Sequence, residues 1–353
     1  MLDPFAGGGS IPLESLRLGC ETFAFDYNPV ATLILKCTLE YPQRFGSYNT
    51  TRNVVAYNQN RDQLLEDVSK WAHWVLEEAR AEIQIFFAPE RDGSIPVGFI
   101  WARTINCQNP LCNAEIPLMK QYWLVKRPNK AILIYPAVSE EKVQFKIVGT
   151  GYGEIPKGFD PNKGTISRAV ATCLVCGSVV DDKTTRKLFE EAKSSQRMIA
   201  VILSKQGVVG KKYRIATDDD IRIFDKTQIY LKKKRDSLLI EWGIDPVPDE
   251  DCPGTVGSNA LEFRYNFIVF GDYFNDRQKL VMITFAEKIR QAYEKMSNQK
   301  LYVRLFLIET LLIWDQRYEY IRDIVSVSCI KHLNICLNYI ISYYGFSLES
   351  NIR

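Results

Sequence analysis

The sequence predicts an α/β protein in which a core of alternating strands and helices is interrupted by a β-rich insert. Three observations favour this fold class: a glycine-rich loop between a short strand and a helix at the start, a run of strand-like segments over residues 97–148, and two closely spaced cysteine pairs. The chain has 353 residues, of which 46% are hydrophobic and 25% charged. This composition is that of a globular protein, and the length indicates more than one domain.

The first segment, "MLDPFAGGGSIPLESLRLGCETFAFDYNPVA", reads as one βαβα unit. The three glycines of its loop permit a left-handed backbone and let a ligand approach the main chain. Ser10 is predicted to cap the first helix, and Gly19 fits the position that follows the end of that helix. A strand over residues 20–25 should then lead into a second helix capped by Asn28.

Acidic residues on either side of the glycine loop limit the kinds of ligand-binding loop that it can be. Asp26 lies 23 residues after Asp3, close to the offset of about 20 residues at which the acid of a dinucleotide-binding fold meets ribose hydroxyls. No Gly-Lys-Ser/Thr follows the glycines, which excludes a P-loop. Gly9 is followed by Ser-Ile-Pro, which breaks the G-x-G-x-x-G pattern. A structural loop without a ligand is the alternative interpretation.

Apolar periodicity predicts helices further along the chain. Residues 61–87 form an amphipathic pattern, and His73 is expected to pack in the core on its apolar face. Another helix is expected over 185–196. A last one, over 276–296, should begin with a capping box formed by Asn275 and Gln278.

A basic cluster in the helix that begins after Thr217 allows two interpretations. The aspartates of its first turn suit the positive end of the helix dipole. Positive charge near the other end of the helix suits the dipole in the same way, and it also suits contact with phosphate groups. The cluster consists of Lys232, Lys233, Lys234 and Arg235.

Four of the nine cysteines have a spacing typical of metal ligands. Cys107 and Cys112 form C-x4-C, and Cys173 and Cys176 form the C-x2-C of a zinc knuckle, followed by Gly177. Four thiolates make a closed tetrahedral site, which points to structural zinc. A redox pair and unrelated buried thiols are the alternatives. The other five show no ligand spacing and are expected to be buried or incidental: Cys20, Cys37, Cys252, Cys329 and Cys336.

Composition limits the remaining function classes. The net charge of +3 and the isoelectric point near 8.2 permit a nucleic-acid partner without indicating one. The presence of only two histidines in the sequence, His73 and His332, argues against a histidine-based catalytic site. The odd cysteine count, the lack of a basic leader pattern and the lack of a long apolar span predict a cytoplasmic protein with no membrane partner.

The order of these motifs resembles one family. "LDPFAGGGSIPLESLRLGCETFAFDYNPVA", "GSIPVGFIWARTINCQNPLCNAEIPL", "GTISRAVATCLVCGS" and "FGDYFNDRQKLVMITF" are similar to segments of the adenine-specific DNA methylases that contain a zinc ribbon. These belong to the class I S-adenosylmethionine-dependent DNA amino-methyltransferases. The resemblance covers residues 1 to about 297. It implies a Rossmann-like class I methyltransferase core, interrupted by a β-rich zinc-ribbon insert, that acts on the exocyclic amine of a DNA base.

The resemblance also assigns roles. The loop would wrap the amino-acid part of S-adenosylmethionine, and Asp26 would take its ribose hydroxyls. The implied cofactor residues are Asp3, Phe5, Gly7, Gly9, Ser10, Asp26 and Asn28. The implied organisation is a cofactor-binding part at 1–60, a connecting helix at 61–95, the split zinc ribbon at 96–182, an α+β segment at 183–258, a return to the core at 259–298, and an unmatched tail at 299–353.

Two departures from the family affect the expected activity. The chain has no Pro-Pro, so the Asp/Asn-Pro-Pro-Tyr/Phe motif that holds the target base is missing, and no catalytic residue is identified. It also has no Pro-Cys, which excludes the nucleophile of cytosine-C5 enzymes. The expectation is therefore a partial copy of the methyltransferase core, with DNA as one partner and a second polypeptide carrying the missing motif as another. A non-catalytic nucleic-acid-binding module, and an RNA or protein methyltransferase, are the rival interpretations.

Overall fold

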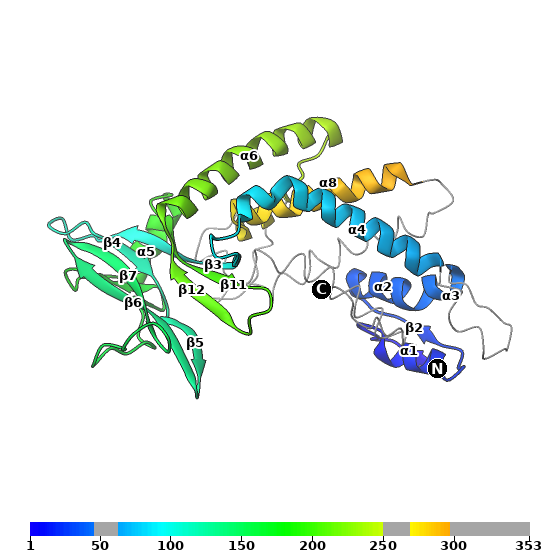
Figure 1. Ribbon diagram of the computed structural model, residues 1–353, viewed down its shortest axis with the longest axis horizontal. Coiled ribbons are helices and arrows are strands. Elements are labelled where there is room, and N and C mark those ends of the chain that lie inside the picture. The colour runs from blue at the N-terminus through cyan, green and yellow to red at the C-terminus, as the bar shows by residue number, and fades with distance from the viewer. Residues whose placement is uncertain (46–62, 250–268, 297–353) are drawn as a thin grey trace. The chain divides into compact units, whose positions relative to one another are not determined.

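The computed structural model describes residues 1–45, 63–249 and 269–296 (Figure 1). These residues are a mixture of helices, antiparallel sheets and one short parallel pair of strands. They divide into two compact units. The described part of the first is 1–45, 63–85 and 281–296, and that of the second is 86–249 and 269–280. The expected tail at 299–353 lies outside the described residues.

The first unit opens with the predicted strand–helix–strand arrangement. β1 (Leu2–Asp3) pairs in parallel with β2 (Phe23–Ala24), and α1 (Ser10–Arg17) connects them. The amide of Gly19 bonds to Leu16 at 2.9 Å and that of Cys20 to Ser15 at 3.0 Å, a helix ending that requires the left-handed Gly19. Two local predictions were wrong. Gly9, not Ser10, precedes the first helical residue, and β2 covers only part of 20–25.

Three consecutive helical segments follow β2. α2 (Pro29–Leu35) passes into a π-helical stretch, η1 (Lys36–Glu40), and then into α3 (Tyr41–Phe45). π-helical turns are rare, and many of those known lie at functional sites. The side chains of Leu35 in α2 and Leu39 in η1 are buried, so these segments pack into the interior of the first unit.

Two longer helices complete the described part of the first unit. α4 (Gln63–Ile83) buries Val68, Val75 and Ala79, which confirms the amphipathic prediction. η2 (Gln84–Phe87) follows it, and α8 (Asp276–Lys295) has its part from residue 281 in this unit. The Glu82 carboxylate lies 2.8 Å from the Lys288 ammonium, which ties α4 to α8.

The prediction for His73 was wrong. Its ring is exposed on α4, with Nδ1 2.7 Å from the carbonyl oxygen of Ser69. The buried positions of the described helix are 67, 68, 72, 75, 76, 79 and 83, so residue 73 lies one step around the helix from the apolar stripe.

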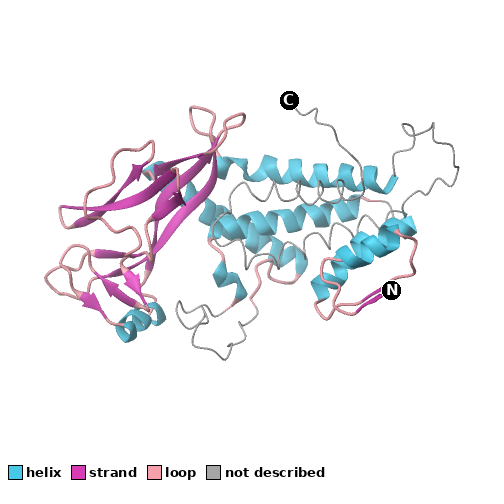
Figure 2. Cartoon of the chain, turned by 90° about the horizontal axis from the view of Figure 1, so that it is seen from below, coloured by secondary structure: helices cyan, strands magenta, loops and turns pink. Residues whose placement is uncertain are grey.

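The described part of the second unit contains three antiparallel sheets (Figure 2). The largest has the order β12-β11-β3-β4, the next has the order β5-β6-β7, and the smallest has the order β10-β9-β8. The strands are β3 (Ile95–Asn106), β4 (Glu115–Leu118), β5 (Trp123–Arg127), β6 (Lys130–Ser139), β7 (Lys142–Gly149), β8 (Ile166–Ser167), β9 (Val170–Thr172), β10 (Val179–Val180), β11 (Ser195–Ser204) and β12 (Lys211–Ile215).

A shared core joins the two larger sheets. Tyr122, Ile134 and Phe145 around the β5-β6-β7 sheet pack with Ile199 and Ala200 of β11. β11 also pairs with β3 along its whole length, although about 90 residues separate them in the chain. The division that the sequence suggested at residue 182 therefore falls inside one structural unit.

Two helices lie against these sheets. α5 (Asp182–Glu190) ends earlier than the predicted 185–196, because β11 already begins at Ser195. α6 (Asp218–Trp242) brings Phe224 to a ring-centroid distance of 4.7 Å from Trp101 of β3. A short 3-10 helix, η3 (Phe270–Tyr273), precedes α8.

The basic cluster does not lie at the end of α6. The helix continues from Lys232 to Trp242, more than two turns further, and the dipole effect is confined to the last turn. The helix-end interpretation was therefore wrong. Arg235 instead donates to both carboxylate oxygens of Asp245, at 2.8 and 3.0 Å. Among the described residues, no helix has the length and apolarity needed to span a bilayer.

Candidate functional site

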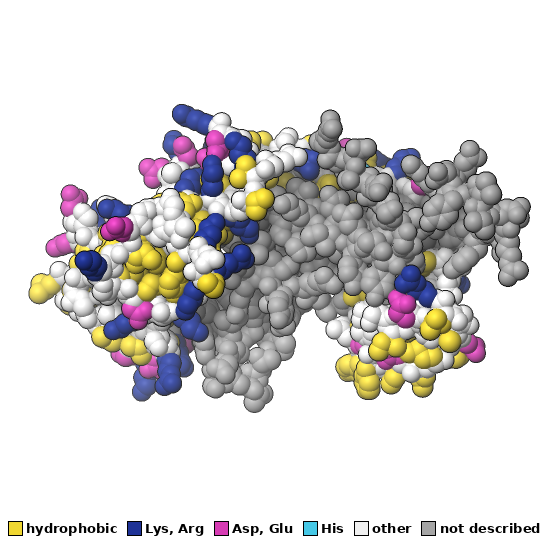
Figure 3. Space-filling view, turned by 60° about the horizontal axis from the view of Figure 1, so that its bottom comes forward, with side chains coloured by type: hydrophobic (Ala, Val, Ile, Leu, Met, Phe, Trp, Pro, Cys, Tyr) yellow, Lys and Arg dark blue, Asp and Glu magenta, His cyan; other side chains and the backbone are white. Residues whose placement is uncertain are grey.

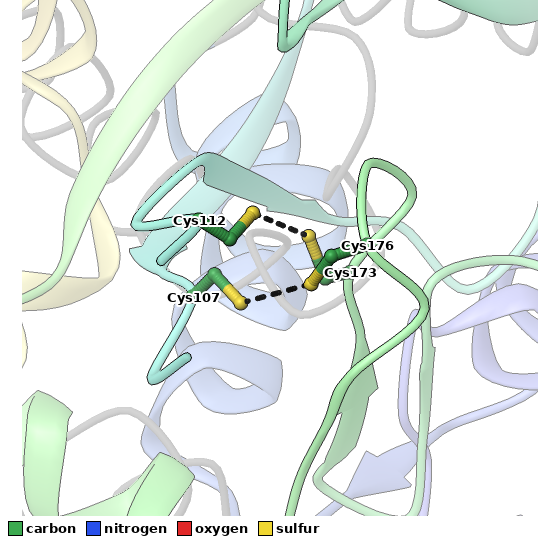
Figure 4. A group of neighbouring side chains, drawn as sticks. All are labelled: Cys107, Cys112, Cys173 and Cys176. Carbon is green, nitrogen blue, oxygen red and sulfur yellow. Dashed lines mark hydrogen bonds between the residues drawn. The ribbon is translucent and has the colours of Figure 1, made fainter. Parts of the chain in front are cut away.

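The four predicted cysteines come together in the second unit (Figure 4). Their sulfur atoms all lie within 4.8 Å of one another, and these residues could hold a metal ion. Cys107 and Cys112 come from the connection between β3 and β4, and Cys173 and Cys176 from that between β9 and β10. Two separate hairpin turns thus face each other.

The first turn is held by its own polar groups. The Cys107 amide bonds to the carbonyl of Ala114 at 2.8 Å, which closes the loop. The amide of Cys112 bonds to the carbonyl of Asn109 at 2.9 Å, and the Asn109 side chain accepts from Leu111 at 3.1 Å. The wider C-x4-C spacing is accommodated because the asparagine forms an extra turn inside the loop.

The second turn is tighter. The amide of Cys173 bonds to Ser178 at 2.9 Å, and the amide of Gly177 bonds to Cys173 at 3.0 Å. Gly177 has a φ of 76°, which confirms that the predicted turn needs its glycine. Ser178 also connects the two turns, because its hydroxyl lies 3.1 Å from the Cys176 sulfur and 3.5 Å from the Asn109 amide nitrogen.

The sulfur positions suit tetrahedral coordination. Cys107 Sγ lies 3.6 Å from Cys176 Sγ, and Cys112 Sγ lies 3.8 Å from Cys173 Sγ. Four sulfurs each about 2.3 Å from a central ion would be about 3.8 Å apart. No disulfide joins these cysteines, which are all free thiols. The donor set therefore fits a four-coordinate metal with no open position, a structural rather than a catalytic arrangement.

The surroundings of the four cysteines shift the pKa values of their thiols in different directions. Burial raises the pKa of Cys107 to about 12, whereas hydrogen bonds from Ser178 lower the pKa of the exposed Cys176 to about 6. A bound cation would replace the protons and stabilise the thiolates. Metal binding at this cluster should therefore release protons and weaken in acid.

The cysteine cluster belongs to a continuous apolar core. Cys107 and Cys173 are 3% and 2% exposed, and they pack with Ile105 and Ile116 of the β3–β4 pair and with Phe189 of α5. A metal ion here would link β3 and β4 to β9, β10 and α5. The sequence pattern identified the four cysteines that come together, but it missed the supporting Asn109 and Ser178.

A second candidate site lies at the carboxyl ends of β1 and β2. Because the two strands are parallel and adjacent, the loops that follow them lie at the same edge of the sheet. The structure thereby brings the seven predicted cofactor residues to this edge. Asp3 ends β1, Phe5, Gly7 and Gly9 lie in the loop that follows, Ser10 begins α1, and Asp26 and Asn28 follow β2.

Asp26 ties the two loops together. One carboxylate oxygen accepts the amide of Gly7 at 2.8 Å, and the other accepts the amide of Asn28 at 2.8 Å. These bonds, first from Asn28 and then from Gly7, lower the pKa of Asp26. The Ala6 amide also bonds to the carbonyl of Phe25 at 2.9 Å. The carboxylate is thus ionised and fixed, and each oxygen retains capacity for a further donor.

Gly9 has a packing role as well as a conformational one. Its φ is 78°, and a Cβ there would lie 2.8 Å from the Cδ2 of Leu35 in α2. By contrast, Phe5 is 82% exposed, Ser10 is exposed, and a Cβ at Gly8 would meet nothing within 4 Å. The loop is therefore anchored at its end and open along its middle, as a ligand-binding backbone would be.

Comparison of this chain with known proteins finds no matching family model, no matching curated protein and no matching solved structure. The function is therefore inferred from the geometry of the two sites.

Proposed function

We propose that this chain is the cofactor-binding and zinc-ribbon part of a cytoplasmic DNA methyltransferase that uses S-adenosylmethionine and acts on adenine N6. One observation carries the proposal: a partly exposed aspartate holds a glycine loop at the carboxyl ends of two adjacent parallel strands. Ligands of open α/β sheets bind at that edge.

In this proposal the loop residues bind and orient the cofactor. The exposed backbone around Gly7 and Gly8 would contact its amino-acid part, and Asp26 would accept its ribose hydroxyls. Bound S-adenosylmethionine supplies an activated methyl group. Because Asp26 already accepts the amides of Gly7 and Asn28, the loop is pre-organised and little further ordering is needed on binding.

The metal of the second unit is proposed to be zinc. Four cysteine thiolates at tetrahedral spacing are a typical structural zinc donor set, and zinc imposes no competing geometric preference. Iron also binds four thiolates in this geometry, so the donor set alone does not separate the two. The hairpin-turn setting and the mutual support by Ser178 favour a closed structural ion.

The proposal includes an incomplete catalytic site. Among the described residues, the nearest imitation of the target-base motif is Asp245-Pro246-Val247-Pro248, where Asp245 is occupied by Arg235 and Val247 is buried. An exocyclic amine conjugated with its base is a poor nucleophile. Its N–H groups need acceptors placed where charge develops, and the ring needs a stacking partner.

A second polypeptide is proposed to complete the site. Parallel strands are normally buried on both faces, yet side chains in and just after β1 and β2 are largely exposed. Phe23, Phe25 and Tyr27 are 51%, 57% and 98% exposed, and Leu2 is 64% exposed. Figure 3 shows hydrophobic side chains gathered on the surface of this part of the chain. Such a surface suits further strands that would carry the missing motif.

Calorimetric titration with S-adenosylmethionine tests the cofactor assignment. The parent chain should bind, and Asp26→Ala should weaken binding about ten- to a hundredfold, because it removes a charged acceptor and frees the loop. Glu14→Ala is the matched control: Glu14 is an exposed acid on α1 whose carboxylate lies 2.9 Å from the Arg17 guanidinium. It should bind like the parent.

Two results of this titration would count against the proposal. Unchanged affinity in Asp26→Ala would remove Asp26 from the site. No binding by the correctly folded parent would favour the rival function, a non-catalytic nucleic-acid-binding module with a vestigial core.

A radiolabelled-methyl assay tests catalytic completeness. The chain alone should transfer no label to mixed-sequence DNA, because cofactor and base can both bind while the reacting atoms remain unaligned. Transfer of label to RNA or protein would support the weaker rival, a methyltransferase of another substrate class. Robust labelling of DNA would show that a catalytic motif has been overlooked.

A further inference from the structure

Two hairpins of the second unit place positive charge side by side. Arg127 and Lys130 face each other across the turn between β5 and β6. Lys211 begins β12, opposite Ser204 of β11. We call these three cations, together with Tyr152 and Tyr213, the hairpin surface. Arg127 and Lys211 are exposed and Lys130 is partly exposed.

Contacts to Lys130, and to Tyr152 in the turn that follows β7, bring β12 next to the β5-β6-β7 sheet. A Cβ built on Gly210 would lie 3.9 Å from the Lys130 ammonium. The Tyr213 amide donates to the Tyr152 hydroxyl at 2.7 Å, and the two rings lie 6.4 Å apart in an edge-on arrangement. Arg127 is close enough for its charge to oppose the burial that raises the pKa of Tyr213.

The two faces of β12 differ in how their charges are compensated. Lys212 and Arg214 point away from Lys211 and Tyr213 because side chains alternate along a strand. Lys212 lies 3.1 Å from Asp92, and Arg214 bonds to Glu90 and Asp220. Over the described part of the chain, no ion pair involves Arg127, Lys130 or Lys211. Positive charge is thus neutralised on one face and left uncompensated on the other.

We propose that the hairpin surface binds the phosphate backbone of duplex DNA. Uncompensated lysine and arginine side chains attract phosphates and release their counterions, and arginine can engage a phosphate with two N–H groups. Adjacent tyrosine hydroxyls add hydrogen-bond donors to phosphate oxygens. Figure 3 shows Lys and Arg side chains gathered over the part of this unit that holds β5 and β12. The choice of DNA rests on the proposed function.

The β-rich unit would thereby have a second task beside holding a metal ion. A protein that modifies a flipped base must hold the flanking duplex while the base is extruded. Contacts to the backbone fix position and orientation without reading sequence. The hairpin surface would therefore contribute affinity for any duplex, and its contribution should decrease steeply as salt increases.

Fluorescence anisotropy with a labelled mixed-sequence DNA duplex tests the inference on the full chain. The variant Arg127→Gln/Lys130→Gln/Lys211→Gln should bind about tenfold more weakly at low salt, or worse. Its slope of log affinity against log salt should be smaller by up to about 2.7, or about 0.9 for each phosphate that the variant no longer neutralises.

The matched control removes the same charge from α5 of the same unit. Lys183→Gln/Arg186→Gln/Lys187→Gln should retain the affinity of the parent, since two of these residues already lie near Asp182 and Glu191. Circular dichroism and metal content verify that both variants fold. Titration with S-adenosylmethionine on the same samples tests the cofactor site separately, so loss of either binding activity identifies which proposal fails.

Three results would overturn the inference: no binding of duplex DNA by the parent, an equal loss of affinity in both variants, or tighter binding of a labelled RNA duplex than of DNA. The first two would remove the surface as a phosphate site, and the third would assign it to a different nucleic acid.

Discussion

Asp220 connects the start of α6 to β12 within the β-rich unit. It is 6% exposed, and its carboxylate accepts from the Arg214 guanidinium at 2.8 Å and from the Thr217 amide at 2.8 Å. Burial alone would raise the pKa of Asp220, but the bonds from Arg214 and Thr217 outweigh burial and lower it. The same carboxylate therefore caps the helix and neutralises a cation of β12.

Asp220→Asn should lower the free energy of unfolding by roughly 2–3 kcal/mol, because it leaves Arg214 with one carboxylate partner and weakens the cap. The cost stays below that of a fully buried pair because the Arg214 side chain is 27% exposed. Urea denaturation measures it. Asp219→Asn, at an exposed neighbour that pairs with the exposed Arg222, is the control and should cost little.

The same residue gives a pH dependence. A carboxyl group whose pKa is lowered on folding contributes its full stability above its unfolded pKa of about 4 and loses it as the pH falls further. The parent should therefore lose more stability below about pH 4 than Asp220→Asn does. If stability fell equally with acid in the parent and in Asp220→Asn, the contacts to Arg214 and Thr217 would not lower the pKa of Asp220.

Single residues also mark the limit of what the sequence predicts. The four metal-binding candidates were predictable because each pair sits in a short turn, where spacing alone fixes geometry. The hydrogen bonds from Gly7 and Asn28 to Asp26 were not predicted, because they depend on how two separate loops meet. The prediction that His73 is buried failed because one step around a helix separates a buried side chain from an exposed one.

At the level of elements, α8 shows a capping box read correctly from two residues. The Asn275 amide donates to Gln278 Oε1 at 2.8 Å, and the Gln278 amide donates to Asn275 Oδ1 at 3.0 Å. Each side chain thus satisfies a backbone donor that the helix leaves free. The Asn275–Gln278 prediction is confirmed.

Asn275→Ala should lower the melting temperature by a few degrees, equivalent to about 1 kcal/mol. The double variant Asn275→Ala/Gln278→Ala should lose less stability than the sum of the losses in the two single variants, because the two bonds support one turn of backbone. Thermal unfolding of the four proteins closes the cycle. Strictly additive losses would mean that the two residues act independently.

Element types were easier to predict than element limits. The strands over 97–148 and the helices α4 and α8 follow clear periodicities. The end of α5 and the continuation of α6 past its basic cluster were missed, because tertiary pairing of β11 and the glycine at 243 decide them. A parallel pair as short as β1–β2 also lies below what periodicity can delimit.

At the scale of the whole molecule, the sequence indicated two kinds of architecture but not how the chain divides between them. Residues from both sides of position 182 form the β-rich unit, since β11 pairs with β3. Long-range pairing of this kind leaves no local signal in a single sequence. The methyltransferase core remains a proposal supported by one βαβ unit, whereas the four-cysteine cluster is explicit in the structure.

A metal ion at the four-cysteine cluster is expected to contribute to the stability of the β-rich unit. Each cysteine pair is local, but the two pairs are about 60 residues apart, so a bound ion would close a long loop between β3 and β10. Binding of metal to such a site contributes directly to folding: on the order of 10 kcal/mol in small zinc peptides, and less where a larger core contributes.

The most direct test is elemental analysis of the purified chain with unfolding followed in parallel. We expect about one zinc per chain, lost in Cys107→Ser and Cys173→Ser together with much of the stability of the β-rich unit. Cys20→Ser, at an exposed cysteine of the first unit, should retain both metal and stability. A chain that contains no metal, folds fully and is equally stable with or without a chelator would contradict the account.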